Sequence, residues 1–169
     1  DRGLTLTTQQ PISLTTQKRI WWIAERLQQD FSSYLSPKEP TLDQTKIENI
    51  IPGMNTLTLL FHPSVEFDDH SYQSVKKALI MLWALSDKAT KEETTQQIIH
   101  EIPVHYGGEY GPDLAALAAY HKLTPQDVIK KHTTPLYQVL FLGFMPGFVY
   151  LYGLDPLLHT PRLSTPRAK

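Results

Sequence analysis

The sequence has no cysteine, almost no net charge and no long apolar run, and each absence excludes a class of protein. Without cysteine the chain forms no disulfide, thiolate metal site or cysteine nucleophile, which agrees with a reducing compartment such as the cytoplasm. Its 16 Lys and Arg residues balance 17 Asp and Glu residues, so no electrostatic footprint for nucleic acid or acidic lipid is present. No apolar run approaches the roughly 20 residues that span a bilayer. We therefore expect neither nucleic acid nor membrane as a partner.

The residues that are present are those of a folded protein. Hydrophobic residues make up 41% of the chain and include three Trp, eight Tyr and six Phe, which is enough to fill a core. At 169 residues the chain has room for one large domain or two small ones. It begins at Asp1 inside a strand-like run and finishes in the extended tract 160–169, so we expect both ends to be cut.

The first half alternates strand and helix patterns. The turn residues at 52–55 join two strands, and Asp68 or Asp69 can cap the second helix. This order predicts an α+β fold in which an antiparallel sheet carries both helices on one face, as in a ferredoxin-like domain. The expected elements are a strand at 3–6, a helix at 15–30, a loop at 31–45, strands at 47–51 and 56–61, and a second helix.

Composition changes after Ser86, where apolar residues nearly vanish as far as Gln97. Such a polar stretch is typical of a linker, so we predict domains at 1–88 and 98–169 joined by residues 89–97. The elements expected in the second domain are a strand at 98–104, a helix at 113–121, a helix starting at the capping-box sequence 124–127, and a strand at 136–142.

A glycine-rich turn at 107–113 joins the predicted strand to the predicted helix. Gly107, Gly108 and Gly111 allow backbone N–H groups to converge next to a helix N-terminus, an arrangement that holds a carboxylate or phosphate. The alternative is a sharp structural turn in which Asp113 only complements the helix dipole. No Gly-Lys-Ser/Thr follows, so the segment is not a phosphate-binding P-loop.

A second segment, 143–153, places aromatic residues between glycines and a proline. A rigid aromatic wall suits a small-ligand pocket or a protein interface. The alternative is a bulged strand whose rings fill a core.

Histidine and arginine give weaker signals. None of the seven His residues has the spacing of a zinc motif, so we predict no metal site in the chain itself. His132 lies at the predicted end of a helix. It either complements the negative end of the helix dipole or acts as an acid and base near neutral pH. Arg162 follows a proline in extended backbone, where its guanidinium either binds an anion or is solvated.

An ordered series of short motifs runs through the second half at 102–108, 111–114, 132–133, 142–148 and 160–162. Together with the hairpin at 51–55 and the opening 1–4, these motifs resemble the family of the sporulation-kinase inhibitor KipI, also called allophanate hydrolase subunit 1. The Gly-Phe-x-Pro-Gly-Phe element at 143–148 is the most specific of them.

The resemblance implies a fold. Family members have an α+β first domain followed by a cyclophilin-like β-barrel, and they continue past the Thr-Pro-Arg tract into glycine-rich strands. We therefore expect a truncated barrel here, with any function of those strands lying outside the 169 residues.

The resemblance also implies an activity. Family members in many bacteria are the B-type subunit of an ATP-dependent 5-oxoprolinase, which opens the 5-oxoproline lactam to L-glutamate. ATP with Mg²⁺ is then a co-substrate, with no permanent cofactor. The expected partners are a homologous barrel subunit of the 5-oxoprolinase C type and a lactam-hydrolase subunit of the A type. The alternatives are an inhibitor that blocks autophosphorylation of a sensor histidine kinase, and a subunit of an allophanate hydrolase.

Roles for individual residues follow from that chemistry as expectations. The glycine turn and Arg162 are expected to hold anions, and Asp113 or His132 to move a proton or support the metal shell. Both glycine-containing segments must then line one hollow. The residues expected to form the aromatic wall are Phe144, Pro146, Gly147, Phe148 and Tyr150.

Overall fold

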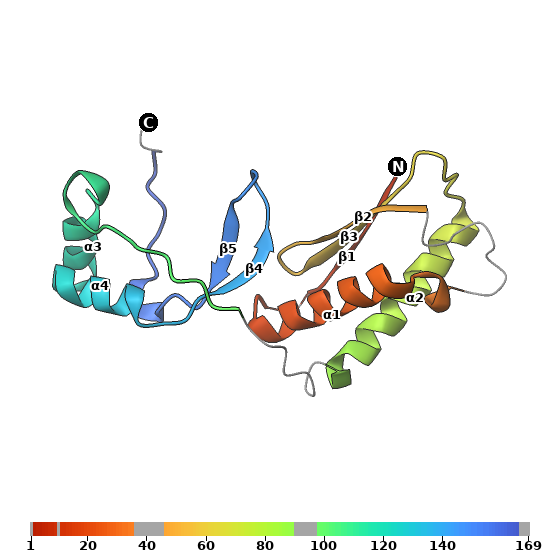
Figure 1. Ribbon diagram of the computed structural model, residues 1–169, viewed down its shortest axis with the longest axis horizontal. Helices are drawn as coiled ribbons and strands as arrows, with labels where there is room; N and C mark the ends of the chain where they lie inside the picture. Colours follow the sequence, from red (N-terminus) through yellow and green to blue (C-terminus); the bar gives the residue numbers. More distant parts are fainter. Residues whose placement is uncertain (1, 10, 36–45, 90–97, 166–169) are drawn as a thin grey trace. The chain divides into compact units, whose positions relative to one another are not determined.

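The structure is a computed structural model that describes residues 2–9, 11–35, 46–89 and 98–165 (Figure 1). The chain divides into two compact units, Asp1–Gln96 with Leu140–Tyr150, and Gln97–Val139 with Leu151–Lys169. The fold is mixed α/β, with one three-stranded and one two-stranded sheet, and no closed barrel forms among the described residues. The domain limits expected from the sequence stay a prediction, and most of the expected linker lies outside the described residues.

The first helix, α1, spans Leu14–Asp30 and confirms the predicted helix at 15–30. It begins where it does because Ser13 accepts a hydrogen bond at Oγ from the Thr16 N–H at 3.1 Å. Its apolar residues recur every three or four positions and are buried together. These buried residues are Ile20, Ile23, Ala24 and Leu27.

The three-stranded sheet consists of β1 (Gly3–Thr7), β2 (Ile47–Pro52) and β3 (Thr56–Phe61). All pairs are antiparallel in the order β1-β3-β2, so the predicted hairpin is confirmed. Its turn contains Asn55 at φ 57°, a left-handed value that Asn tolerates. Buried and half-buried side chains alternate along β3, and the buried ones are apolar. These are Leu57, Leu59 and Phe61.

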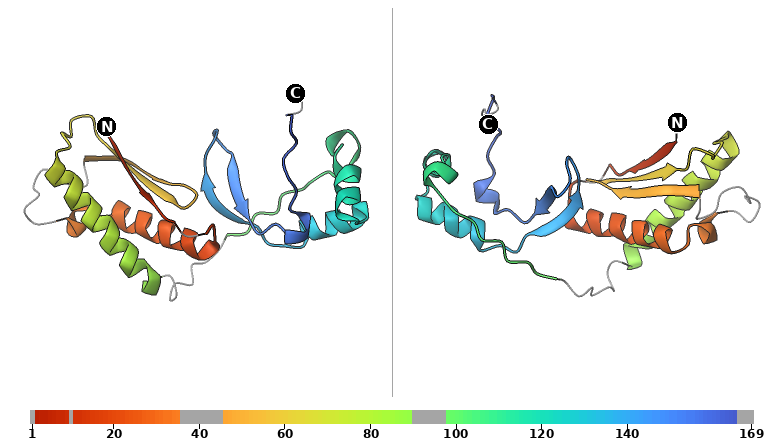
Figure 2. Two further views of the ribbon diagram at one scale, coloured as in Figure 1. Left: turned by 180° about the vertical axis from the view of Figure 1, so that it is seen from behind. Right: turned by 45° about the horizontal axis from the view of Figure 1, so that its top comes forward.

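The second helix, α2, spans Asp69–Ala89. Asp68 accepts the Ser71 N–H at 2.8 Å, which settles the choice between the two candidate caps. Figures 1 and 2 show α1 and α2 on the same side of the sheet, as the element order predicts. Arg19 joins the two helices: it donates to the Trp83 carbonyl at 2.6 Å and lies 3.6 Å over the Trp83 ring.

The two-stranded sheet is a hairpin of β4 (Gln138–Leu142) and β5 (Val149–Tyr152). The Leu140 carbonyl accepts two hydrogen bonds from α1, from Gln17 Nε2 at 3.2 Å and from Trp21 Nε1 at 2.7 Å. These bonds explain why residues 140–150 belong to the first unit. The adjacent residues Trp21 and Trp22 therefore have different surroundings, because Trp21 binds the hairpin while Trp22 is buried in the core.

The second unit holds two short helices, α3 (Leu114–His121) and α4 (Pro125–Thr133), and the single turns η3 (Gly108–Tyr110) and η4 (Pro156–Leu158). Both helices were expected from the sequence. The capping box is complete, because Thr124 Oγ1 accepts the Asp127 N–H at 3.1 Å and Asp127 Oδ2 accepts the Thr124 N–H at 3.2 Å. A small core joins these elements through Ala118, Val128 and Leu158.

The strand predicted at 98–104 is wrong. Residues 98–104 form no strand, and all are exposed, with Ile98 at 83% and Ile102 at 75%. A strand is stabilised by its partner, and within the described residues no neighbouring strand offers this segment its backbone groups. Pro103 also removes one ladder donor. The predicted loop at 31–45 contains a single helical turn, η1 (Ser32–Tyr34), and lies outside the described residues from residue 36.

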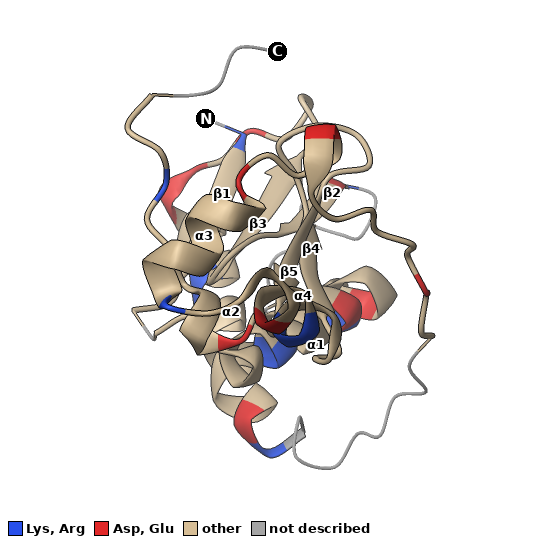
Figure 3. Cartoon of the chain, turned by 90° about the vertical axis from the view of Figure 1, so that its left-hand side faces the viewer, with Lys and Arg blue, Asp and Glu red and all other residues tan. Residues whose placement is uncertain are grey.

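The helices have the mixed charge and limited hydrophobicity that the composition indicates. Figure 3 shows acidic and basic residues on both α1 and α2 rather than a surface of one sign. Among the described residues, every helix is too short or too polar to cross a bilayer.

Candidate functional site

The glycine turn of the second unit folds back on itself. Gly107 and Gly108 have φ values of 79° and 58°, in the left-handed region that favours glycine. A Cβ on Gly111 would lie 2.5 Å from the Gly107 nitrogen, so only glycine permits this close backbone approach. The Gly111 N–H donates to the Gly107 carbonyl at 3.0 Å and closes the turn. The backbone geometry therefore requires or favours glycine at each of these three positions.

The turn leads directly into α3 and is open on one side. The Leu114 N–H donates to the Gly111 carbonyl at 3.2 Å, so this amide is already used within the turn. A Cβ built on Gly108 would meet no atom within 4 Å, which leaves room for another group beside that residue. Asp113 is the N-cap residue of α3, but its side chain makes no capping hydrogen bond. A small anion can approach this turn at Gly108, with the helix N-terminus behind it.

His132 is held between two tyrosines in the same unit. Tyr106 Oη lies 2.5 Å from His132 Nδ1, and the two rings meet edge to face at 5.7 Å. Tyr137 donates its hydroxyl to the His132 carbonyl at 2.8 Å, and its ring lies 5.6 Å from the imidazole. His132 occupies the last turn of α4, where the helix dipole favours positive charge. The ring is thus oriented through Nδ1.

The electrostatics around His132 favour a neutral tyrosine at 137. Burial raises the pKa of Tyr137 above its usual value of 10.0, and the neighbouring Tyr106 and Asp155 act in the same direction. Asp155 is ionised, because the Leu157 N–H and then Lys131 lower the pKa of its carboxyl. Lys131 Nζ lies 3.3 Å from Asp155 Oδ2. Tyr137 therefore keeps its proton and donates it to the backbone of His132.

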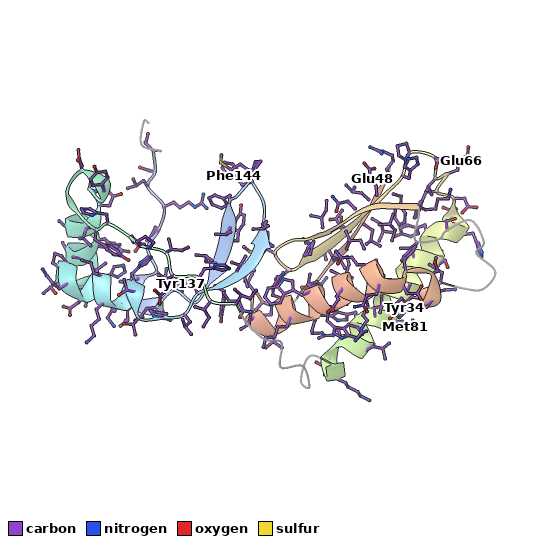
Figure 4. The ribbon with its side chains drawn as sticks, in the orientation of Figure 1. Tyr34, Glu48, Glu66, Met81, Tyr137 and Phe144 are labelled. Carbon is purple, nitrogen blue, oxygen red and sulfur yellow. The ribbon has the colours of Figure 1, made fainter. Side chains whose placement is uncertain are left out.

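The aromatic segment forms the end of the β4–β5 hairpin. Phe144 lies at its tip, with φ 66° and 80% of its surface exposed (Figure 4). Edge-to-face contacts run from Phe144 to Phe148 at 5.5 Å and on to Tyr150 at 5.1 Å. Gly147 has φ 80°, and Pro146 precedes it in the turn. Phe144 and Phe148 are exposed and Tyr150 is half-buried, so among the described residues these rings form a largely exposed wall rather than a core.

The structure places the predicted site residues in both units. The turn residues, Asp113, His132 and Arg162 belong to the second unit, and Phe144 to Tyr150 belong to the first. Arg162 lies in the exposed segment after η4, and no side-chain contact joins it to the other site residues within the described chain. That these segments line one hollow, and the role of each residue, stay predictions.

Sequence reasoning missed the two tyrosines. Tyr106 immediately precedes Gly107 within the motif, and Tyr137 follows His132 by five residues, but neither spacing predicts a contact with an imidazole. The contact of Tyr106 with His132 depends on the tertiary structure, because it forms only when α4 packs beside the start of the glycine turn. The described residues contain no group of three metal-ligating side chains. A Mg²⁺ ion that arrives with a nucleotide needs only one or two carboxylates, a requirement that Asp113 at the turn fits.

Comparison with known proteins places the chain among homologues. Residues 1–169 match the family described as carboxyltransferase domain, subdomain C and D. The chain is 34% identical over 167 residues to the B subunit of 5-oxoprolinase from Escherichia coli O157:H7, covering 99% of this chain and 66% of that protein. It is 36% identical over 157 residues to the protein of the same name from Haemophilus influenzae, covering 93% and 63%.

A solved structure is also similar. The crystal structure of TTHA0988 has a TM-score of 0.67 and 30% sequence identity, covering 98% of this chain and 28% of that one. The chain therefore spans less than two thirds of the length of the relatives that it matches.

Proposed function

This chain belongs to the carboxyltransferase domain, subdomain C and D family, and we propose that it acts as a subunit of a 5-oxoprolinase. Its relatives are named as 5-oxoprolinase subunits, which supports this enzymatic role and supports the proposal that the chain acts within a complex. The activity is the opening of the 5-oxoproline lactam to L-glutamate. One water adds across the broken lactam C–N bond, and a second is consumed as ATP is cleaved to ADP and phosphate.

The proposed fold is the one that the family resemblance implies. The first unit, with its order β1-β3-β2 and two helices on one side, is the ferredoxin-like part. The β4–β5 hairpin contributes to a cyclophilin-like barrel whose remaining strands correspond to the further length of the relatives. The exposed apolar side chains of the hairpin are consistent with further packing, because a monomer rarely leaves such a patch uncovered.

The chemistry explains why ATP is needed. Amide resonance makes the lactam carbonyl a poor electrophile, and phosphorylation of its oxygen supplies a good leaving group. ATP with Mg²⁺ is the co-substrate. The turn at Gly107–Gly111 holds an anionic group beside the N-terminus of α3, and Asp113 supports the metal's water shell. Arg162 binds a carboxylate, since its guanidinium is matched to that group.

His132 is the proposed proton carrier, and one contact carries this assignment. Tyr106 Oη lies 2.5 Å from Nδ1, and we assign the tautomer in which Nδ1–H donates to that oxygen. Nε2 is then the basic nitrogen, which accepts a proton from an attacking water. Tyr106 is therefore a positioning residue. Because Tyr106 also precedes Gly107, the same bond holds the imidazole next to the first residue of the anion turn.

The aromatic wall from Phe144 to Tyr150 is proposed to shield the reacting ring from water and to dock the partner subunits. Those partners are a homologous barrel subunit and a lactam-hydrolase subunit. A wall that is exposed in this chain becomes buried when a partner covers it, which favours electrostatic stabilisation of the reacting groups.

The decisive experiment is reconstitution. The complete protein is co-purified with the second barrel subunit and the lactam-hydrolase subunit, and ADP release is measured with 5-oxoproline as the only varied component. We expect release that depends on 5-oxoproline. If allophanate replaces it as the active substrate, or if only a histidine kinase's autophosphorylation responds, the proposal fails in favour of that alternative.

Two variants test the residue roles. Gly147→Val and Asp113→Asn should each depress turnover while circular dichroism stays unchanged. Glu109→Gln is the matched control for Asp113, because Glu109 is an exposed carboxylate in the same turn. Full activity of both test variants would remove their residues from the site.

A further inference from the structure

A pocket opens in the first unit, where the start of β1 meets the end of β3 and the first turn of α2. Its volume is about 330 Å³, at the small end of the range for small-molecule sites. The backbone at its rim is fixed, because the Phe61 N–H donates to the Arg2 carbonyl at 2.8 Å. None of its lining residues is one of the candidate site residues described above. The lining residues are Arg2, Gly3, Leu4, Phe61, Phe67, Asp68, Asp69 and Tyr72.

Part of the pocket lining is apolar and aromatic. Phe61 is 1% exposed, and its ring centroid lies 4.6 Å from that of Phe67. Leu4 and Tyr72 also line the pocket, and Tyr72 on α2 is 43% exposed. A ligand that binds here buries an apolar body of modest size against Leu4, Phe67 and Tyr72.

The lining also carries charges of both signs. Asp68 is fixed by the Ser71 N–H, and this hydrogen bond lowers the pKa of its carboxyl, which is therefore ionised at neutral pH. No side-chain partner is seen for Asp69 in the described part of the chain. Arg2 donates from Nη1 to Glu48 Oε2 at 3.1 Å, which occupies one of its five N–H donors and leaves others for a ligand.

We propose that this pocket binds a zwitterionic α-amino acid with an apolar side chain. Its carboxylate pairs with Arg2, its ammonium group pairs with Asp69, and its side chain lies on Phe67 and Tyr72. A ligand with a single charge gains a charge-assisted hydrogen bond to only one of these two side chains. An amino acid satisfies both at once, and one of leucine size fits the volume.

Three probes separate the contributions. L-leucine carries both charges, 3-methylbutylamine is leucine without its carboxylate, and 4-methylpentanoate is leucine without its ammonium group. Their dissociation constants are measured on the full chain by NMR titration of the Phe67 and Tyr72 ring resonances. We expect leucine to bind at least about tenfold more tightly than either half-ligand, as a charged hydrogen bond predicts.

Variants of the pocket give the second readout. Asp69→Asn should weaken leucine about tenfold and leave 4-methylpentanoate unchanged. Glu48→Gln should tighten leucine, because Arg2 loses a competing carboxylate. Glu66→Gln is the matched control: it removes a nearby exposed carboxylate that does not line the pocket and should change nothing (Figure 4).

The proposal is overturned by any of three results. The first is no ring shift with leucine. The second is an amine or a carboxylate that binds as tightly as leucine. The third is an equal loss of affinity in Asp69→Asn and Glu66→Gln. Unchanged spectra of the variants without ligand show that the fold has been kept.

Discussion

Tyr106 Oη lies 2.5 Å from His132 Nδ1, so a residue that directly precedes the glycine turn is bonded to the last turn of α4. Neither the turn nor the histidine alone indicates chemistry, since each has an ordinary structural explanation. The hydrogen bond connects the glycine turn to the histidine, because Tyr106 directly precedes Gly107 and its hydroxyl contacts the ionisable ring of His132.

Tyr106→Phe tests this relationship. Loss of the hydroxyl frees Nδ1, and the reconstituted enzyme should lose about tenfold in kcat with little change in KM, the effect of one hydrogen bond on an oriented base. The ¹⁵N shifts of the His132 ring should change as well, because Nδ1 loses its hydrogen-bond partner. Tyr120→Phe, at an exposed tyrosine of α3, is the control. Unchanged ring shifts in Tyr106→Phe would contradict the assignment.

The glycine turn predicts a difference between two matched variants. Gly111→Ala brings a Cβ to 2.5 Å from the Gly107 nitrogen and should destabilise the protein by about 2–3 kcal/mol. Gly108→Ala meets no atom within 4 Å and suffers only the left-handed φ of 58°, at about 1 kcal/mol. Urea unfolding measures both. Equal losses would mean that the turn does not fold back as described.

The capping box of α4 predicts a pH dependence. Hydrogen bonds from the Thr124 side chain and backbone lower the pKa of Asp127 below its usual value of 3.8. A depressed folded-state pKa adds stability above the unfolded value, and this stability is lost as pH falls through the folded value. Asp127→Asn should therefore lower Tm at pH 7, and the difference from the unchanged protein should shrink below pH 3.8. A difference that is constant with pH would contradict the ionised box.

The hydrogen bonds to Leu140 predict that α1 stabilises the β4–β5 hairpin. Trp21→Phe removes the 2.7 Å donor and should cost about 1 kcal/mol, with faster hydrogen exchange at Gly143, whose N–H donates to Phe148. Trp22→Phe is a fitting control, because Trp22 Nε1 is buried and has no hydrogen-bond partner among the described residues. It should reduce packing without changing exchange in the hairpin. Equal exchange in both variants would contradict the role of Leu140.

Local signals explain which elements were predictable. The caps at Ser13 and Thr124 and the alternation in 56–61 act within a few residues, so the sequence is enough to place α1, α4 and β3. The run at 98–104 has the composition of a strand, but its hydrogen bonds must come from a distant partner, and no local pattern encodes that partner. The Tyr106 contact was hidden for the same reason. The glycines of the turn at 107–111 were predictable because a positive φ at one position favours glycine at that position, whatever its distant neighbours are.

Phe144 provides the test that separates docking from folding. With 80% of its surface exposed, its side chain contributes little to the stability of this chain, and Phe144→Ala should leave Tm within about a degree. The same change removes the ring that leads the aromatic wall, so affinity for the partner barrel subunit should fall at least about tenfold, as for an aromatic hot spot. Isothermal titration with the partner measures this affinity.

Leu142→Ala is the matched control for Phe144→Ala, because it deletes a similarly exposed apolar side chain that lies before the tip of the hairpin. It should leave the affinity for the partner nearly unchanged. Phe144 has a φ of 66° at the tip and packs edge to face on Phe148, so its ring is held outward by the backbone and by one neighbour. An unchanged affinity in Phe144→Ala would leave this exposed ring without a role in assembly and would move the docking surface elsewhere.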